Sequence, residues 1–265
     1  MTEWEVYAIK YAGQPGRVRG NNFMFADDHD ADSPIDFYMW LIRGAGRVIL
    51  VDTGFDAVEG AARGRPIRLD PVAALKPFDL APEDVTEIIV THLHFDHAGG
   101  LHLFPNAQLY LQAAEMAYAT GPCMCHDTLR QPYTAGHVCE AVKRLYQGKL
   151  TFHDGTAELA DGLTLHCIGG HSRGMQAVRV RTKAGWMVLA SDAAHFYENI
   201  SSGKPFPIVV DLQDMLDGFD TLRRLASRPA LIVPGHDPLV GTLFPRTLDD
   251  HIRRLDVGPK GPVPL

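Results

Sequence analysis

Short apolar runs separated by polar or glycine-rich turns recur along this sequence, and they predict β-strands. Residues 37–42 and 48–51 are two such runs, and the turn Gly44-Ala45-Gly46 between them predicts a β-hairpin. The other apolar runs that predict strands cover residues 4–11, 87–91, 107–111, 150–152, 163–168, 177–180, 186–190 and 230–233. Many short strands with helical segments between some of them are therefore expected.

Helical periodicity is clearest in residues 212–226, where Met215, Phe219 and Leu222 recur three or four positions apart. Residues 112–119 predict a further helix, and residues 71–84 predict short helical or loop pieces. With no repeat and no linker-like stretch in view, we expect a single domain over residues 1–265. Two segments stand apart in this prediction: an inserted, lid-like segment at about residues 113–150, and a loose, proline-rich tail at about residues 258–265.

The densest chemistry follows the strand predicted at residues 87–91. His92, His94, Asp96 and His97 lie within six positions of one another. Side chains two apart on an extended chain point to the same side, so His92 and His94 can face one point in space. Two neighbouring histidines can be coincidence, but four ligand residues directly after a buried strand predict a metal site. The glycines at positions 99 and 100 are expected to let the backbone pass close to whatever these side chains hold.

Three other predicted strands also end in a residue that can bind a metal. These residues are His171, Asp192 and His236. Strand ends on one edge of a sheet are where α/β proteins build their sites, so we expect all seven side chains to converge. Seven ligands are too many for one zinc ion and suit two metal ions that share the carboxylate of Asp192. Nitrogen-rich ligation without cysteine favours zinc, with manganese, iron or cobalt as alternatives.

A pair of such ions would hold a bridging water whose pKa falls towards neutrality, which indicates a hydrolytic centre. Asp52, at the end of the run 48–51, is interpreted as a carboxylate that orients one of the ligand histidines. The alternative for Asp52 is a plain turn residue.

Composition narrows the class of protein. Hydrophobic residues make up 46% of the chain and charged residues 22%, as in ordinary globular proteins. A net charge of −7 argues against nucleic acid or an anionic membrane as partner, and no apolar run is long enough to span a bilayer. No secretory signal is visible, and four cysteines do not make a disulfide framework in 265 residues, so a cytoplasmic location is expected.

The ligand pattern resembles the metallo-β-lactamase superfamily at every metal position, over about residues 35–240. The resemblance implies an α/β fold, specifically a four-layer αβ/βα sandwich of two face-to-face sheets with helices outside. It also implies two ligand sets. His92, His94 and His171 would hold one ion, Asp96, His97 and His236 the other, and Asp192 would bridge them.

Within the superfamily, the chain looks most like the quorum-quenching N-acyl-homoserine lactonases. The β-lactamases proper lack a histidine equivalent to His97, and glyoxalase II enzymes carry a basic C-terminal region that has no counterpart after His236. Those lactonases usually have a tyrosine three residues after the bridging aspartate, where this chain has His195. A different lactone or a cyclic amide therefore stays open as the substrate.

We expect the protein to open the ring of a small-molecule lactone by attack of a metal-bridging hydroxide. Asp96 would move the proton, Asp192 would hold both ions, and His195 would donate a hydrogen bond to the oxyanion, with a packing role as the alternative for His195. A substrate pocket is placed provisionally at Phe23, Met24, Phe25, Phe196 and Tyr197.

Two kinds of rival stay open. The first is another hydrolase of the same fold, acting on a cyclic amide, a thioester or a phosphodiester, and a basic pocket would favour the phosphodiester. The second is a metal-binding protein without catalytic activity. A homodimer is expected only because dimers are common.

Overall fold

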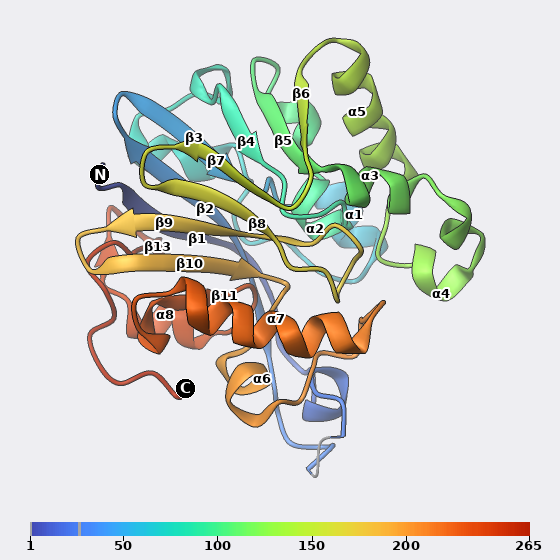
Figure 1. The fold of residues 1–265 in the computed structure, drawn as a ribbon, viewed down its shortest axis with the longest axis vertical. Coiled ribbons are helices and arrows are strands. Elements are labelled where there is room, and N and C mark those ends of the chain that lie inside the picture. The colour runs from blue at the N-terminus through green and yellow to red at the C-terminus, as the bar shows by residue number, and fades with distance from the viewer. Residues whose placement is uncertain (1, 26–27) are drawn as a thin grey trace.

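Two β-sheets lie face to face in the computed structural model, which describes residues 2–25 and 28–265, and helices cover the outer faces (Figure 1). The larger sheet has eight strands in the order β12-β13-β1-β2-β3-β4-β5-β6. Their bounds are β1 Glu5–Gln14, β2 Ile35–Gly44, β3 Arg47–Val51, β4 Glu87–Ile89, β5 Gln108–Gln112, β6 Leu150–His153, β12 Arg246–Thr247 and β13 Asp249–Arg254. Strands β3 to β6 run parallel, and the remaining pairs are antiparallel.

The smaller sheet has five strands in the order β11-β10-β9-β8-β7. Their bounds are β7 Thr156–Ala160, β8 Leu163–Cys167, β9 Gln176–Thr182, β10 Gly185–Ser191 and β11 Ile232–Pro234. Only β10 and β11 pair in parallel. The α-helices are α1 Ala57–Ala62, α2 Phe95–Ala98, α3 Ala113–Ala119, α4 Asp127–Arg130, α5 Ala135–Tyr146, α6 Tyr197–Ser202, α7 Leu212–Leu225 and α8 Leu239–Leu243.

Three separate layers of buried apolar side chains hold these elements together. One lies on the outer face of the larger sheet, one between the two sheets, and one between the smaller sheet and α7. The sequence of strand β2 is apolar throughout because both faces of the strand are buried. Met39 and Leu41 enter the outer layer, while Trp40 and Ile42 enter the layer between the sheets. Three apolar layers separate four layers of structure, which confirms the predicted αβ/βα sandwich.

The predicted strands and the helix at 212–226 are all present, and the sequence missed several others. Strands β7, β12 and β13 and helices α1, α6 and α8 were not predicted. Within the segment at 113–150, helix α5 packs Val138 and Ala141 into the outer apolar layer, whereas α4 projects from the body of the protein (Figure 1). In the tail, the Lys260 N–H donates to the Leu243 carbonyl, and Leu265 packs against two of the apolar layers.

None of the helices in the described part of the chain combines the length and apolar character needed to cross a bilayer.

Candidate metal centre

The predicted ligands meet at one edge of the two sheets. His92, His94, Asp96 and His97 follow β4, on the larger sheet. His171, Asp192 and His236 follow β8, β10 and β11, on the smaller sheet. All seven are at least nine-tenths buried. The site is therefore built from both sheets, as strand ends on a common edge predict.

Four overlapping groups of donor atoms form within this cluster, and two of them have no residue in common with each other and do not include Asp192. In each group all donor atoms lie within 4.8 Å of one another. One group contains His92, His94 and His171, and the other contains Asp96, His97 and His236. These are the two ligand sets that the family resemblance implies.

Asp192 lies between the two groups, and its two carboxylate oxygens approach histidines of both. Its Oδ1 is 3.2 Å from His97 Nε2 and 3.0 Å from His236 Nε2, whereas its Oδ2 is 3.2 Å from His171 Nε2 and 3.3 Å from His236 Nε2. A carboxylate in this position can give one oxygen to each of two ions. Gly235 permits the arrangement, because a Cβ at position 235 would lie 2.7 Å from Asp192 Oδ1.

Buried nitrogen and oxygen atoms without a hydrogen-bond partner indicate whether these side chains fit metal ions. Within residues 2–25 and 28–265, His92 Nε2, His97 Nε2 and Asp192 Oδ1 are buried and make no hydrogen bond. Buried polar atoms are rarely left in this state, since each costs about 1–3 kcal/mol without a partner. Three such atoms pointing into one cluster of imidazoles and carboxylates fit bound cations. The donor set, five histidines and two carboxylates, suits zinc and related divalent metals.

Protonation favours metal binding at some of the candidate ligands and opposes it at His97. Burial lowers the pKa of His92 and of His94 well below that of free imidazole, so both rings are neutral. Burial would raise the pKa of Asp192, but the adjacent histidines, His195 first, hold it well below its usual range. Burial would lower the pKa of His97, but nearby carboxylates, led by Asp192, raise it. Metal binding would thus have to displace a proton from His97.

Asp52 lies in contact with His97, one of the candidate ligand histidines. Its Oδ2 lies 2.7 Å from His97 Nδ1 and accepts a hydrogen bond from the Thr91 hydroxyl, while its Oδ1 accepts one from the Thr91 N–H. Asp52 is fully buried and has φ of +60°, a conformation that non-glycine residues seldom adopt. This strain is typical of a functional site. With Nδ1 held by Asp52, Nε2 of His97 is left facing the cluster.

The glycines at 99 and 100 have a different role from the one predicted. A Cβ at Gly100 would lie 2.5 Å from the Thr53 carbonyl oxygen, and one at Gly99 would lie 2.8 Å from the Gly54 carbonyl oxygen. They allow the chain after the ligands to pack on the turn that follows β3. The close approach is thus to protein backbone, and it fixes Asp52 against His97.

Glu115 is a residue of the site that the sequence did not reveal. Its buried carboxylate accepts hydrogen bonds from the N–H groups of Leu93 and Gly174 and from the hydroxyls of Tyr133 and Ser172. Leu93 lies between two ligand histidines, and Ser172 follows a third. Glu115 therefore ties together the two loops that carry His92, His94 and His171. In the sequence it resembles any surface glutamate of a short helix.

His195 also faces the cluster. Its Nε2 is 3.0 Å from Asp192 Oδ2, and its ring stacks on Phe206 with centroids 3.7 Å apart. Burial lowers the pKa of His195 to about 3, against the raising effect of Asp192, so the ring is neutral and carries one N–H. The side chain lines the cavity beside the ligands. It is thus placed to contact a molecule bound there.

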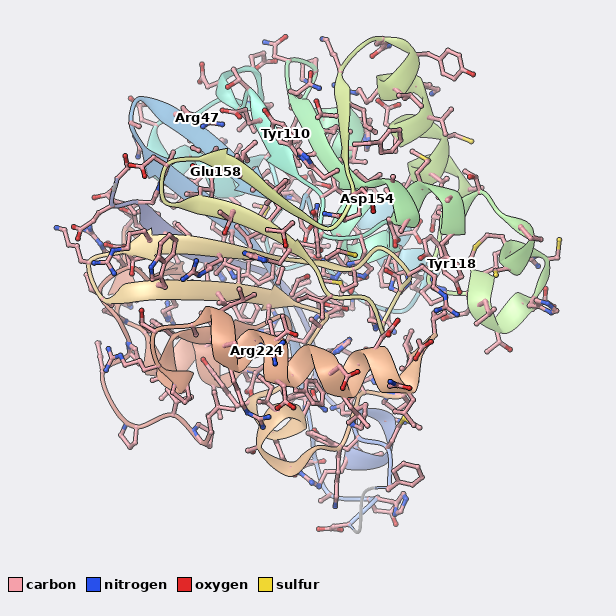
Figure 2. All side chains as sticks on the ribbon, viewed as in Figure 1. Arg47, Tyr110, Tyr118, Asp154, Glu158 and Arg224 are labelled. Carbon is pink, nitrogen blue, oxygen red and sulfur yellow. The ribbon has the colours of Figure 1, made fainter. Side chains whose placement is uncertain are left out.

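Two adjoining cavities lead to the cluster. The smaller, about 90 Å³, is lined by the ligands Asp96, Asp192 and His236 and by His195 and Phe206. The larger, about 480 Å³, shares His94, His171 and Ile208 with it and extends to Leu129 and Tyr118. Tyr118 lies on the side from which α4 projects (Figure 2). Part of the segment predicted as a lid, including Gln131 and Pro132, lines both cavities.

The five residues proposed for the substrate pocket line neither of these two cavities. The rings of Phe23 and Phe196 contact each other in a tilted arrangement, with centroids 5.2 Å apart, and line a separate hollow. Tyr197 is fully buried between the sheets, and Phe25 is 73% exposed. Met24 is held by its N–H, which donates to the Pro205 carbonyl. The apolar lining of the cavities comes instead from Ile35, Phe37, Phe95, Leu129, Phe206 and Ile208.

A comparison with known protein families agrees with the metal centre that this geometry suggests. Residues 38–236 match the metallo-beta-lactamase superfamily, and the chain belongs to it.

Curated relatives are named lactonases. An N-acyl homoserine lactonase of Bacillus cereus is 31% identical over 172 residues, which are 64% of this chain and 59% of that protein. AttM, an N-acyl homoserine lactonase of Azorhizobium caulinodans, is 26% identical over 260 residues, 90% of this chain and 95% of that protein.

Solved structures of lactonases are also similar to this chain. A quorum-quenching N-acyl homoserine lactone lactonase is similar with a TM-score of 0.74 and 25% identity, over 89% of this chain and 93% of that one. AidC, a dizinc quorum-quenching lactonase, has a TM-score of 0.71 at 18% identity, over 89% and 88%. The predicted fold, family and enzyme class are confirmed: the chain is a hydrolase of this superfamily, related to N-acyl homoserine lactonases.

Proposed function

We propose that the protein opens the ring of a lactone at a dinuclear metal centre, with zinc as the metal. The observation that carries the proposal is the pair of buried donor groups on either side of Asp192, whose carboxylate lines the same cavity as Asp96 and His236. His92, His94 and His171 would hold one ion, Asp96, His97 and His236 the other, and Asp192 both. Bound there, the ions would supply a water of lowered pKa and would polarise the ester carbonyl.

The side chains of the protein account for the remaining requirements. The Asp96 carboxylate lines the cavity, so it can accept the proton of the attacking water and return it to the ring oxygen as the C–O bond breaks. His195 lines the cavity and would donate its N–H to the carbonyl oxygen as negative charge develops there. Asp52 holds His97 in the orientation that ligation requires.

A second candidate, phosphodiester hydrolysis, is favoured by one observation. Arg17 and Arg65 line the same cavity as the candidate ligands, so two guanidinium groups are available there for a phosphate. Arg173, the basic residue beside a ligand in the sequence, points elsewhere and pairs with Asp211. Phosphate oxygens are well suited to guanidinium groups, so both reactions belong in one test.

The test is a pH-indicator assay of the zinc-loaded protein. Hydrolysis of each of these substrate classes produces an acid and releases a proton. One assay therefore covers acyl-homoserine lactones of several chain lengths, plain γ- and δ-lactones, a thioester and a phosphodiester. Lactone turnover that a chelator removes and zinc restores is the expected result. Turnover of the phosphodiester with every lactone unchanged would overturn the proposal in favour of the second candidate.

Two variants frame this assay. Asp192→Asn removes the shared carboxylate and should abolish lactone turnover. His102→Ala changes an exposed histidine five residues after the ligand motif and should leave turnover unchanged.

A further inference from the structure

Two arginines face the cavity that holds the candidate metal ligands. Arg17 comes from the segment between β1 and β2, and Arg65 from the segment after α1. The guanidinium carbon of Arg17 lies 5.6 Å from the centre of the Phe206 ring, and that of Arg65 lies 5.0 Å from the centre of the Phe95 ring. In a protein of net charge −7, the two arginines thus bring two positive charges to this cavity, which Asp96 and Asp192 also line.

Neutral groups hold both arginines in place. Arg17 donates from Nε to the side-chain oxygen of Asn22 at 2.8 Å and from Nη2 to the carbonyl of Asn21 at 2.6 Å. Asn22 is fully buried and is fixed by its own hydrogen bonds to Ser33. Arg65 donates from Nε to the side-chain oxygen of Gln14 at 3.2 Å. Several guanidinium N–H groups of the pair therefore stay free for a ligand.

No carboxylate within residues 2–25 and 28–265 forms an ion pair with Arg17 or Arg65. Arg63, which also lies over the Phe95 ring, shows the usual arrangement, because it pairs with Glu59. Burial and the neighbouring Arg65 lower the pKa of Arg17 to about 10, with Asp96 opposing them, so the guanidinium is still charged at pH 7. Two like charges brought together without a carboxylate in direct ion-pair contact favour binding of an anion between them.

We propose that the substrate carries a carboxylate, which binds between Arg17 and Arg65 while the ester to be cleaved lies against the histidine cluster. The proposal rests on the lactone ring-opening function and adds the substrate class. Planar N–H pairs of guanidinium groups match the two oxygens of a carboxylate. The aromatic rings of Phe37, Phe95 and Phe206 would pack against the ring between these two ends.

A matched pair of lactones tests this. The probes are 5-oxotetrahydrofuran-2-carboxylate and its carboxamide, which differ only in the charge of the substituent. Water adds to the ring carbonyl of the carboxylate probe, the ring C–O bond breaks, and 2-hydroxyglutarate and one proton are released. Hydrogen bonds to a charged group imply that kcat/KM is about 10- to 100-fold higher for the carboxylate. Added KCl should raise KM for the carboxylate more than for the carboxamide.

Three variants locate the effect. Arg17→Gln and Arg65→Gln should each lower the carboxylate-to-carboxamide ratio of kcat/KM about tenfold, mainly through KM. Arg68→Gln is the matched control, since Arg68 is exposed, lies in the same segment as Arg65 and is remote from the cavity, and its ratio should equal that of the unchanged protein. Arg17→Lys keeps the charge and should retain part of the preference, which separates charge recognition from loss of folding.

The outcomes are distinct. A ratio near one, or a ratio that neither glutamine variant changes, would overturn the carboxylate proposal while lactone turnover still supports the general function. Turnover of bis(4-nitrophenyl) phosphate with both lactones intact would overturn the two proposals together.

Discussion

Individual side chains set the orientation of the ligands, and Asp52 is the clearest case. Its carboxylate joins His97 to the backbone and hydroxyl of Thr91, which directly precedes the ligand motif. The sequence predicted this role from the position of an acid at a strand end. It could not predict the left-handed backbone of Asp52, because that conformation depends on the packing of Gly99 and Gly100 against the turn.

Replacing Asp52 by asparagine should therefore weaken metal binding. An amide cannot accept from His97 and Thr91 as the carboxylate does, and loss of such a partner costs about 10- to 100-fold in metal affinity. Competition for zinc with a coloured chelator measures the effect. Asp79→Asn is the control, because Asp79 has a similar φ of +57° and is exposed far from the site, where asparagine tolerates the same backbone. Equal zinc affinity in D52N and D79N would contradict the role of Asp52.

His195 tests a different property, since it is proposed to act on the substrate. His195→Ala should lower kcat about 100-fold, the usual cost of removing one oxyanion donor. Two zinc ions per chain should remain, as measured by elemental analysis after gel filtration. A variant that loses zinc along with activity would instead show that His195 holds Asp192, 3.0 Å away, in place for the metal.

At the scale of elements, the site depends on contacts between the two sheets. Glu115 in α3 bonds to the loop after β4 and to the loop after β8, and Gly174 in that second loop must be glycine because a Cβ there would lie 2.2 Å from the Glu115 nitrogen. Gln176 at the start of β9 adds a further link, since its side chain donates to the Val90 carbonyl. These links place His171 beside His94, with 2.9 Å between their ring nitrogens.

Glu115→Gln should lower both stability and metal affinity. A glutamine side chain turns one acceptor into a donor that faces the N–H donors of the loops, and a lost hydrogen bond to a charged group costs about 1.5–3 kcal/mol. Urea unfolding of the metal-free protein measures the change in the free energy of unfolding. Glu158→Gln, on β7 and exposed, is the control and should be neutral (Figure 2). If E115Q unfolds at the same urea concentration as the control, the carboxylate does not hold the two loops together.

For the whole molecule, the sequence predicted what depends on local pattern and missed what depends on chain packing. Candidate ligands at strand ends follow from periodicity and residue type, so all seven could be named from the sequence, and the structure brings their side chains together. Arg17, Arg65 and Phe206 come from segments without periodicity, and only the folded chain brings them to one cavity. Phe23 and Phe196 were chosen as pocket residues because they are aromatic, yet packing places them in a separate hollow.

Because four ligands belong to the larger sheet and three to the smaller one, bound metal should hold the two sheets together. A ligand at 100 times its dissociation constant adds about 2.7 kcal/mol to the free energy of unfolding, and in a protein of this size that shifts Tm by about 5–10 °C. Calorimetry with zinc and then with excess chelator should show this difference in the unchanged protein and in His102→Ala. Asp192→Asn should lose most of it, because its neutral amide cannot bridge two ions. A zinc-dependent shift of full size in D192N would mean that the other ligands, which come from both sheets in each proposed set, hold the metal without the shared carboxylate, and it would contradict the bridging role of Asp192.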